Sequence, residues 1–253
     1  MDFKLNVVAN NLANIETVAF KRSRANFEDL LYQTLEEPGL RNGLDKPLPT
    51  GQQVGLGVQV SGTQLNFEQG AFDHSQQPLD LAIEGDGFFQ VQSIVDGQET
   101  TVYTRAGNFT RNADGELVLA NSGGARLEPA ITIPQDAVDI AISPQGLVQA
   151  RTTGATAFTD IGQIELAKFV NPAGLKAIAS NLYQQTDASG PPITGNPTTQ
   201  GMGSLQQNYL ELSNVDPVRE LIELIQTQRA FELNSQAIQS ADQTLQTVNN
   251  LRR

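Results

Sequence analysis

The sequence contains no cysteine and no tryptophan, and its single histidine is His74. The missing cysteines exclude cysteine nucleophiles and zinc sites built from cysteine and histidine. A Ser-His-Asp triad would have to use His74, which stands in a polar stretch typical of a surface loop. Glu84, Asp86 and Asp114 each precede a glycine, which is typical of turns, and the EF-hand spacing is absent. We therefore predict no catalytic residue, no metal site and no cofactor.

Long apolar runs are missing as well. No segment approaches the roughly 20 apolar residues that a helix needs to span a bilayer. The first residues also lack the layout of a cleaved secretory signal. We therefore predict no membrane insertion, and either a cytoplasmic location or export by a route without a cleaved signal.

Basic residues are scarce, because 16 Lys and Arg stand against 28 Asp and Glu. This balance excludes a nucleic-acid surface, which needs clustered basic side chains. Residues 50–215 carry most of the acidic excess, with 6 basic and 16 acidic side chains. The two ends of the chain are close to neutral, so copies of the chain can pack together there without strong repulsion.

Residues 1–32 are predicted to form a helix followed by an extended segment. Leu5, Val8 and Leu12 repeat at the spacing of one helix face. Several asparagines, which are poor helix formers, weaken this helix, so that it should need a partner to be stable. The Asn-rich stretch at residues 9–14 is either a solvated helix end or an assembly interface.

Residues 50–205 have the composition of short strands joined by tight turns. Asp-Gly and Gly-Gly pairs separate runs such as residues 87–91, 101–104 and 116–119, which predicts hairpins. Residues 130–134 are predicted to form a further strand, ended by proline. Residues 189–203 are rich in Gly, Pro, Thr and Asn and are predicted to form a long loop.

The last part of the chain is predicted to be one long helix. Asp216 is a favoured N-cap, Pro217 fits the first helical position, and neither glycine nor proline follows up to residue 251. Apolar residues recur every seven positions and form a stripe along one face of the helix. Gln228, three residues before Phe231, is a polar residue on this same face. This stripe packs either on the chain's own β domain or on neighbouring copies. Its members are Leu224, Phe231, Ile238 and Leu245, widened by Leu221.

The sequence thus predicts an α+β fold. A mainly β central domain, hairpin-rich and sandwich- or barrel-like, is flanked by terminal helices that pack together as a coiled coil. The apolar stripes of the two helices can be buried against each other and against neighbouring copies of the chain. Such head-to-tail contacts either close into a ring or continue as a helical polymer. The expected parts are residues 1–32 and 216–253 as an inner-tube domain, 33–49 as a linker, 50–205 as a β-rich outer domain, and 206–215 as a return segment.

The residues predicted to form the assembly interface lie on both terminal segments. They are Leu5, Val8, Asn10, Asn11, Leu12, Asn14, Phe20, Leu221, Leu224, Gln228, Phe231, Ile238 and Leu245.

Three separated motifs resemble the axial family of bacterial flagellar rod and hook proteins. The N-terminal motif is Ala9-Asn10-Asn11-Leu12-Ala13-Asn14 with Phe20-Lys21-Arg22. The C-terminal motif is Ser213-Asn214-Val215-Asp216 with Gln228-Arg229-Ala230-Phe231-Glu232. The interior segment Leu81–Val91 looks like the start of the family's shared β domain. Together they cover essentially the whole chain in the order that the family has.

Two further segments, Phe27–Thr34 and Gly51–Gly57, resemble the distal rod branch of this family. The resemblance implies a structural subunit, self-assembling into a periplasm-spanning tube that transmits torque from motor to hook. It implies export through the flagellar type III apparatus without a cleaved signal peptide. The implied neighbours are the proximal rod proteins, the hook and hook–rod junction, and the peptidoglycan and outer-membrane ring proteins.

The chain departs from the family pattern in two places. The family has a longer helix before the first motif, which predicts weaker independent assembly here. Val18-Ala19 replaces the usual Asn-Gly, which predicts a turn with φ below zero. The alternatives are another axial type (proximal rod or hook), an adhesin, or a secreted β-rich enzyme that acts on the cell wall. A glycan hydrolase would need two carboxylates facing one cleft.

Overall fold

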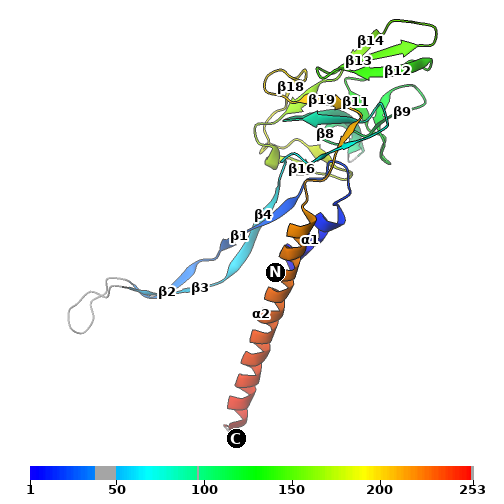
Figure 1. Cartoon of the computed structure of the whole chain (residues 1–253). Helices are drawn as coiled ribbons and strands as arrows, with labels where there is room; N and C mark the ends of the chain where they lie inside the picture. Colours follow the sequence, from blue (N-terminus) through cyan, green and yellow to red (C-terminus); the bar gives the residue numbers. More distant parts are fainter. Residues whose placement is uncertain (38–49, 96, 252–253) are drawn as a thin grey trace. The chain divides into compact units, whose positions relative to one another are not determined.

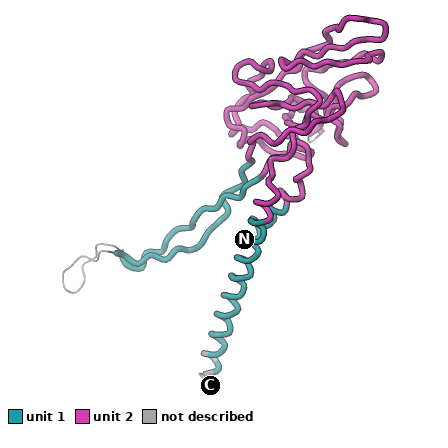
Figure 2. The backbone as a smooth tube through the Cα atoms, viewed as in Figure 1, with its two compact units in different colours: residues 1–9, 23–65, 222–253 teal, residues 10–22, 66–221 magenta. Residues whose placement is uncertain are grey.

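The computed structural model describes residues 1–37, 50–95 and 97–251. The chain divides into two compact units, drawn in teal and magenta in Figure 2. Unit 1 comprises residues 1–9, 23–65 and 222–253, and unit 2 comprises residues 10–22 and 66–221. Two α-helices run from one unit into the other, α1 (Asp2–Ala13) and α2 (Pro217–Leu251). The structure is mostly β with a helix at each end of the chain, as predicted.

Unit 1 is built on a two-stranded antiparallel ribbon (Figure 1). Its strands are β1 (Ser23–Asp29), β2 (Tyr32–Glu36), β3 (Gln52–Gly55) and β4 (Val58–Leu65), which pair as β1 with β4 and β2 with β3. Phe27 lies opposite Val60, and Asp29 lies opposite Val58. A two-stranded ribbon leaves one edge of each strand without a ladder partner and is marginally stable on its own.

This ribbon changes the expected division of the chain. Residues 33–36 lie in β2 rather than in a linker, and residues 52–65 belong to the ribbon of unit 1 rather than to the outer β domain. The reason is that these strands bond to one another across the ribbon and contribute no side chain to the β-domain core. The remainder of the expected linker, residues 38–49, lies outside the described residues.

The largest sheet of unit 2 has nine strands and curves as half of a barrel. Along it, neighbours are β16, β17, β8, β7, β11, β10 and β9, while β15 pairs with both β7 and β18. The strands are β7 (Phe88–Val95), β8 (Gln98–Thr104), β9 (Phe109–Arg111), β10 (Leu117–Leu119), β11 (Arg126–Glu128), β15 (Leu166–Lys168), β16 (Lys176–Ala177), β17 (Leu182–Gln184) and β18 (Ile193–Gly195).

Smaller sheets complete unit 2. Strands β12, β13 and β14 form a three-stranded sheet, and β19 with β6 and β20 with β5 form two-stranded ones. Their bounds are β5 (Phe72–His74), β6 (Leu81–Glu84), β12 (Ala137–Ile142), β13 (Leu147–Thr152), β14 (Thr159–Gln163), β19 (Ser204–Gln207) and β20 (Tyr209–Glu211), with a short 3₁₀ helix at Pro172–Gly174.

The apolar core of unit 2 lies between these sheets. Alternate residues of β7, Phe89 and Val91, point into it, because successive side chains of a strand face opposite sides. Phe89 packs edge-on against Phe109 at a centroid distance of 5.1 Å. Other fully buried members include Leu81, Ile83, Leu117, Leu119, Leu127, Ile133, Ile164 and Leu166.

Two segments of unit 2 differ from the sequence-based expectation. Residues 130–134 make an isolated bridge between Thr132 and Glu116 rather than a strand, although Ile131 and Ile133 are buried. The predicted loop at 189–203 contains β18, which gains its partner from β15. Each segment becomes a strand only if a neighbouring strand offers an unpaired edge. Short-range sequence patterns do not show whether such an edge exists.

The long helix begins and ends where the sequence predicts. The carboxylate of Asp216 accepts hydrogen bonds from the backbone N–H groups of Val218 (3.0 Å) and Arg219 (3.3 Å). It thereby satisfies donors of the first turn, which have no partner within the helix. With 35 residues, α2 is about 52 Å long at roughly 1.5 Å per residue.

The turn at Val18-Ala19 contradicts the prediction of a φ below zero. Ala19 has φ of +56°, in the left-handed region that Cβ disfavours by roughly 1 to 2 kcal/mol. Its fully buried methyl group belongs to the core, and its N–H donates to the carbonyl of Glu211 at 2.8 Å. These tertiary contacts hold the conformation that local preference disfavours.

Candidate assembly interface

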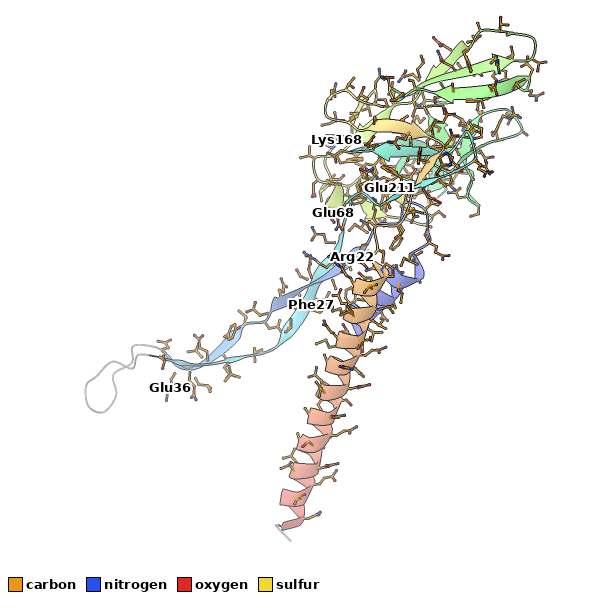
Figure 3. The ribbon with its side chains drawn as sticks, viewed as in Figure 1. Arg22, Phe27, Glu36, Glu68, Lys168 and Glu211 are labelled. Carbon is orange, nitrogen blue, oxygen red and sulfur yellow. The ribbon has the colours of Figure 1, made fainter. Side chains whose placement is uncertain are left out.

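Three charged side chains meet in the interior of unit 2. Lys21 Nζ lies 2.6 Å from Glu211 Oε1, and Arg105 Nε lies 2.8 Å from Glu211 Oε2. Their side chains are 0 to 4% exposed, which is rare for Lys, Arg and Glu unless they are paired. They come from the segment after α1, from the residue that follows β8 and from β20. The cluster therefore joins the segment around Lys21 to the strands of unit 2; Figure 3 labels Glu211.

The remaining polar atoms of this cluster are also satisfied. Arg105 donates to the backbone carbonyls of residues 83, 85 and 87, and Lys21 donates to the carbonyl of Glu68 at 2.7 Å. Glu211 also accepts the N–H of Gly70 at 2.9 Å. A Cβ at residue 70 would lie 2.1 Å from the carbonyl oxygen of Leu212, so the backbone approach at this site requires glycine.

Burial shifts the pKa values of two members of the cluster. Desolvation lowers the pKa of the Lys21 amine to about 8, although the Glu211 carboxylate opposes the change. Desolvation alone would raise the pKa of Glu211, but the charges of Arg105 and Lys21 outweigh it and lower this pKa below 4.5. The carboxylate therefore stays ionised at neutral pH.

We expect the Lys21 amine to make unit 2 more stable as the pH rises. Its pKa is lower in the folded chain than the ordinary 10.5, so between pH 8 and 10.5 the unfolded chain binds more protons. The free energy of unfolding of the native chain, minus that of Lys21→Met, should increase by about 1 to 2 kcal/mol between pH 7.5 and 9.5. Urea unfolding at each pH measures it. A difference that decreases with pH would contradict the lowered pKa.

A second cluster joins the two terminal motifs within unit 2. Asn214 accepts the backbone N–H of Arg22 at 2.8 Å and donates to the carbonyls of Asn66 and Glu68 at 2.8 and 2.9 Å. Its carboxamide thus ties three segments together. Glu220, in the first turn of α2, is fully buried and lies 2.6 Å from the Arg22 guanidinium, labelled in Figure 3.

The asparagines of the N-terminal motif find partners inside the chain. Asn11 is 1% exposed and donates to Glu220 at 3.1 Å. Asn14 donates to the carbonyl of Asn10 at 2.9 Å and accepts from Thr17, which closes the end of α1. Asn10 itself is exposed. Of this motif, Asn10 is therefore the asparagine that an assembling neighbour could reach most directly.

The apolar stripe of α2 is uncovered over most of its length. Leu224 is partly buried, and Gln228 is exposed. Leu221, Phe231, Ile238 and Leu245 are 45, 49, 64 and 67% exposed. On α1 and the turn after it, Val8 is buried, while Leu5, Leu12 and Phe20 are intermediate. These side chains of α2 are therefore available to a neighbouring chain.

The two helices touch near the start of α2. Lys4 forms an ion pair with Glu223 at 2.8 Å, and Asn11 bonds to Glu220. With 12 residues, α1 is about 18 Å long and cannot cover the 35 residues of α2. The predicted coiled coil between the terminal helices is therefore not established within one chain.

Unit 1 has almost no core of its own. Among its described residues, Val8 is the single buried apolar side chain. Large apolar side chains are exposed along the ribbon and on α2, including Phe27, Leu31, Leu35, Leu56, Val58, Ile222, Phe231 and Leu233. A groove of about 540 Å³ runs along the unit; it is lined by Met1, Lys4, Phe27, Val58, Val60, Gln226, Thr227 and Ala230. Unit 1 therefore presents the apolar surface of an interface.

Sequence patterns did not reveal the buried charge cluster or the ribbon side of the groove. Lys21 is part of the N-terminal motif, but nothing in the sequence pairs it with Glu211. Phe27 lies opposite Val60 across the ribbon, and this pairing depends on a register that the sequence did not reveal. One sequence feature could have indicated the ribbon. Val58 and Val60 alternate with polar residues, which predicts a strand with apolar side chains on one face.

Neither a metal site nor a spanning helix is found in the described part of the chain. No three His, Asp or Glu side chains gather there as possible metal ligands. No helix among these residues is both long enough and apolar enough to cross a bilayer.

Two family models match the chain. The flagellar hook protein FlgE/F/G D1 domain matches residues 82–150, which include β7 to β12 of unit 2. The flagellar basal body rod FlgEFG protein C-terminal region matches residues 206–251, which include β20 and α2.

Whole proteins of known families align over nearly the full length. The flagellar basal-body rod protein FlgG of Caulobacter vibrioides is 47% identical over 247 residues, covering 97% of this chain and 92% of that protein. The same-named protein of Borreliella burgdorferi is 42% identical over 253 residues, covering 99% and 94%. The flagellar basal-body rod protein FlgF of Caulobacter vibrioides is 36% identical, covering 90% and 83%. The chain belongs to the FlgG family of flagellar basal-body rod proteins.

Proposed function

We propose that the chain is a structural subunit of the distal rod of the bacterial flagellar basal body. Copies assemble into a helical tube through unit 1 and through residues 10–22 and 217–221 of the terminal segments, and the tube transmits torque from the motor to the hook. The observation that carries this proposal is the exposed apolar surface of unit 1, with Val8 as the single buried apolar residue among those described. A surface of this kind is stable in water when other chains cover it.

The residues that meet neighbouring copies are those that one chain leaves open. Leu221, Phe231, Ile238 and Leu245 on α2 form one part, with Gln228 fixing the register between chains. Asn10 adds an exposed position of α1, and Phe27 with Val58 adds the ribbon. Val8 and Asn11 are buried and support this surface from within. The partly buried residues contribute the part of their side chains that one chain leaves exposed; they are Leu5, Leu12, Asn14, Phe20 and Leu224.

Unit 2 supplies the rigid part of the subunit. Its fully satisfied charge cluster and continuous apolar core resist deformation, as torque transmission requires. Its acidic surface keeps the chain soluble before assembly. We assign no catalytic role to it, in keeping with membership of a family of rod proteins.

The proposed partners follow from the place of the subunit in the rod. They are other copies of the chain, the proximal rod proteins, the hook and hook–rod junction, the peptidoglycan and outer-membrane ring proteins, and the type III export apparatus. The rod spans the periplasm.

Electron microscopy of the purified full chain over a range of concentrations tests the proposal. We expect tubes or curved filaments above a critical concentration and dispersed chains below it. Circular dichroism should show helix content rising on assembly, because α2 beyond its first turns lacks partners in the single chain. A dispersed particle at every concentration, with helix content already complete, would contradict assembly through unit 1.

A further inference from the structure

The main sheet of unit 2 splits along one edge of β7. On one side, β7 pairs with β8. On the other side, it pairs with β11 over residues 90–92 and with β15 over residues 88–89. The chain leaves β11 at Glu128-Pro129 and returns at Glu165 before β15, so the two strands diverge from the same point of β7.

A polar groove of about 340 Å³ lies at this split. Leu127, Pro129 and Ala130 form its apolar part. Its polar side chains are Gln90, Gln92, Glu128, Glu165 and Thr194. All of these residues belong to unit 2.

Gln90 is the unusual residue of this groove. Its side chain lies on the face of β7 opposite Phe89 and Val91, and the residue is 8% exposed. The side chain makes no hydrogen bond to another described residue, although most side chains of such buried polar residues have a partner. Its amide atoms reach the solvent-accessible groove, so a molecule bound in the groove can form hydrogen bonds with them.

The two carboxylates of the groove are not neutralised by a cation. Glu128 accepts a hydrogen bond from Thr101 at 2.8 Å, which uses one of its oxygens. Glu165 is partly buried and has neither a hydrogen bond nor an ion pair with any described residue. No Lys or Arg lines the groove. Residues 50–215 carry 16 acidic and 6 basic side chains, so the wider field also attracts cations.

We propose that this groove binds the guanidinium group of an arginine presented by a partner protein. A guanidinium offers five N–H donors in a planar fork, which match two carboxylates, the Gln90 carbonyl oxygen and the Thr194 hydroxyl. The methylene stem of the arginine lies against Pro129 and Ala130, which are exposed, whereas Leu127 faces the core. A lysine ammonium has three donors at one point and reaches fewer of these acceptors. These side chains carry seven oxygens, of which one on Glu128 and that of Gln92 already accept hydrogen bonds; the remaining five are fewer than the six to eight that Ca²⁺ takes.

Ligand-detected NMR with the full chain tests the proposal, whether or not the chain is polymerised. The probe is the tripeptide Gly-Arg-Gly, and the matched probe is Gly-citrulline-Gly, which keeps the shape and lacks the charge. We expect saturable binding of the arginine peptide with a dissociation constant on the order of 1 mM, and at least about tenfold weaker binding of the citrulline peptide.

Variants of the chain locate the site. Glu165→Gln should weaken binding of the arginine peptide about tenfold, because a charge-assisted hydrogen bond is lost. Glu99→Gln is the matched control: Glu99 is exposed on β8 and does not line the groove, so this change should leave binding unaltered.

Gln90→Leu separates a binding role from a structural one. We expect it to weaken peptide binding about tenfold and to leave the urea midpoint unchanged or raised, since the amide has no partner in the fold. A lowered midpoint would show that the amide supports the fold, and would overturn the assignment of Gln90. Equal binding of both peptides, or tighter binding of a neutral disaccharide or of Ca²⁺, would overturn the guanidinium site. None of these results depends on whether the chain forms tubes.

Discussion

Replacing Glu211 by leucine is expected to lower the free energy of unfolding of unit 2 by about 3 to 5 kcal/mol. Lys21 and Arg105 lie 2.6 and 2.8 Å from its two oxygens, and both cations are buried. The substitution leaves two like charges in the interior without a counter-charge, and it leaves the N–H of Gly70 without its acceptor. Urea unfolding followed by circular dichroism and by tyrosine fluorescence measures the loss.

The surface pair of Glu116 and Arg126 provides the control. Its charged atoms are 3.5 Å apart, and the side chains are 22 and 44% exposed. Glu116→Gln should therefore cost about 1 kcal/mol or less. Adding Lys21→Met to Glu211→Leu should recover part of the loss, because one uncompensated cation is removed. If Glu211→Leu cost no more than Glu116→Gln, the cluster would not be what holds the Lys21 segment in unit 2.

Phe231→Asp is expected to raise the critical concentration for assembly by at least about a thousandfold. Phe231 is 49% exposed in the single chain, so the change should alter the stability of that chain by less than about 0.5 kcal/mol. In the assembled tube the same position is covered, and an unpaired buried carboxylate costs several kcal/mol. Since about 1.4 kcal/mol corresponds to a factor of ten, an increase of this size follows. Sedimentation of polymer at increasing concentration measures it.

Gln236→Asp is the matched control for this experiment. It adds the same charge to an exposed polar position of α2, five residues after Phe231 and on another face. We expect this variant to assemble at nearly the native concentration. In cells, both variants should be exported in normal amount, because export takes place before assembly. Normal tubes from Phe231→Asp at the native concentration would show that this stripe is not part of the interface.

Local chemistry made the helices and turns predictable. Asp216 and Pro217 set the start of α2, and the absence of later breakers set its length, because caps and breakers act within one turn. Gly97 and Gly115 adopt positive φ values of 81° and 86° at two of the predicted hairpin turns. Ala19 shows the limit of such reasoning: its positive φ is held by a buried methyl group and by a bond to Glu211, far away in the sequence.

The candidate sites depend on residues that are distant in the chain. Lys21 and Glu211 are separated by 190 positions, and Arg105 and Glu211 by 106. The ribbon places Phe27 opposite Val60, and the split in the main sheet brings Glu128 and Glu165 to one groove. A charged residue in a sequence looks the same whether it ends in solvent or in the interior.

By itself, the sequence determined which sites were excluded, where α2 begins and ends, and the family motifs at both chain ends. It also determined that these ends are nearly neutral and carry apolar stripes. Only the tertiary structure decided which charges are buried, that the stripe of α2 stays uncovered in one chain, and that Gln90 has no partner. The reason is physical: propensity, capping and periodicity act over a few residues, whereas burial and pairing are set by contacts between distant segments.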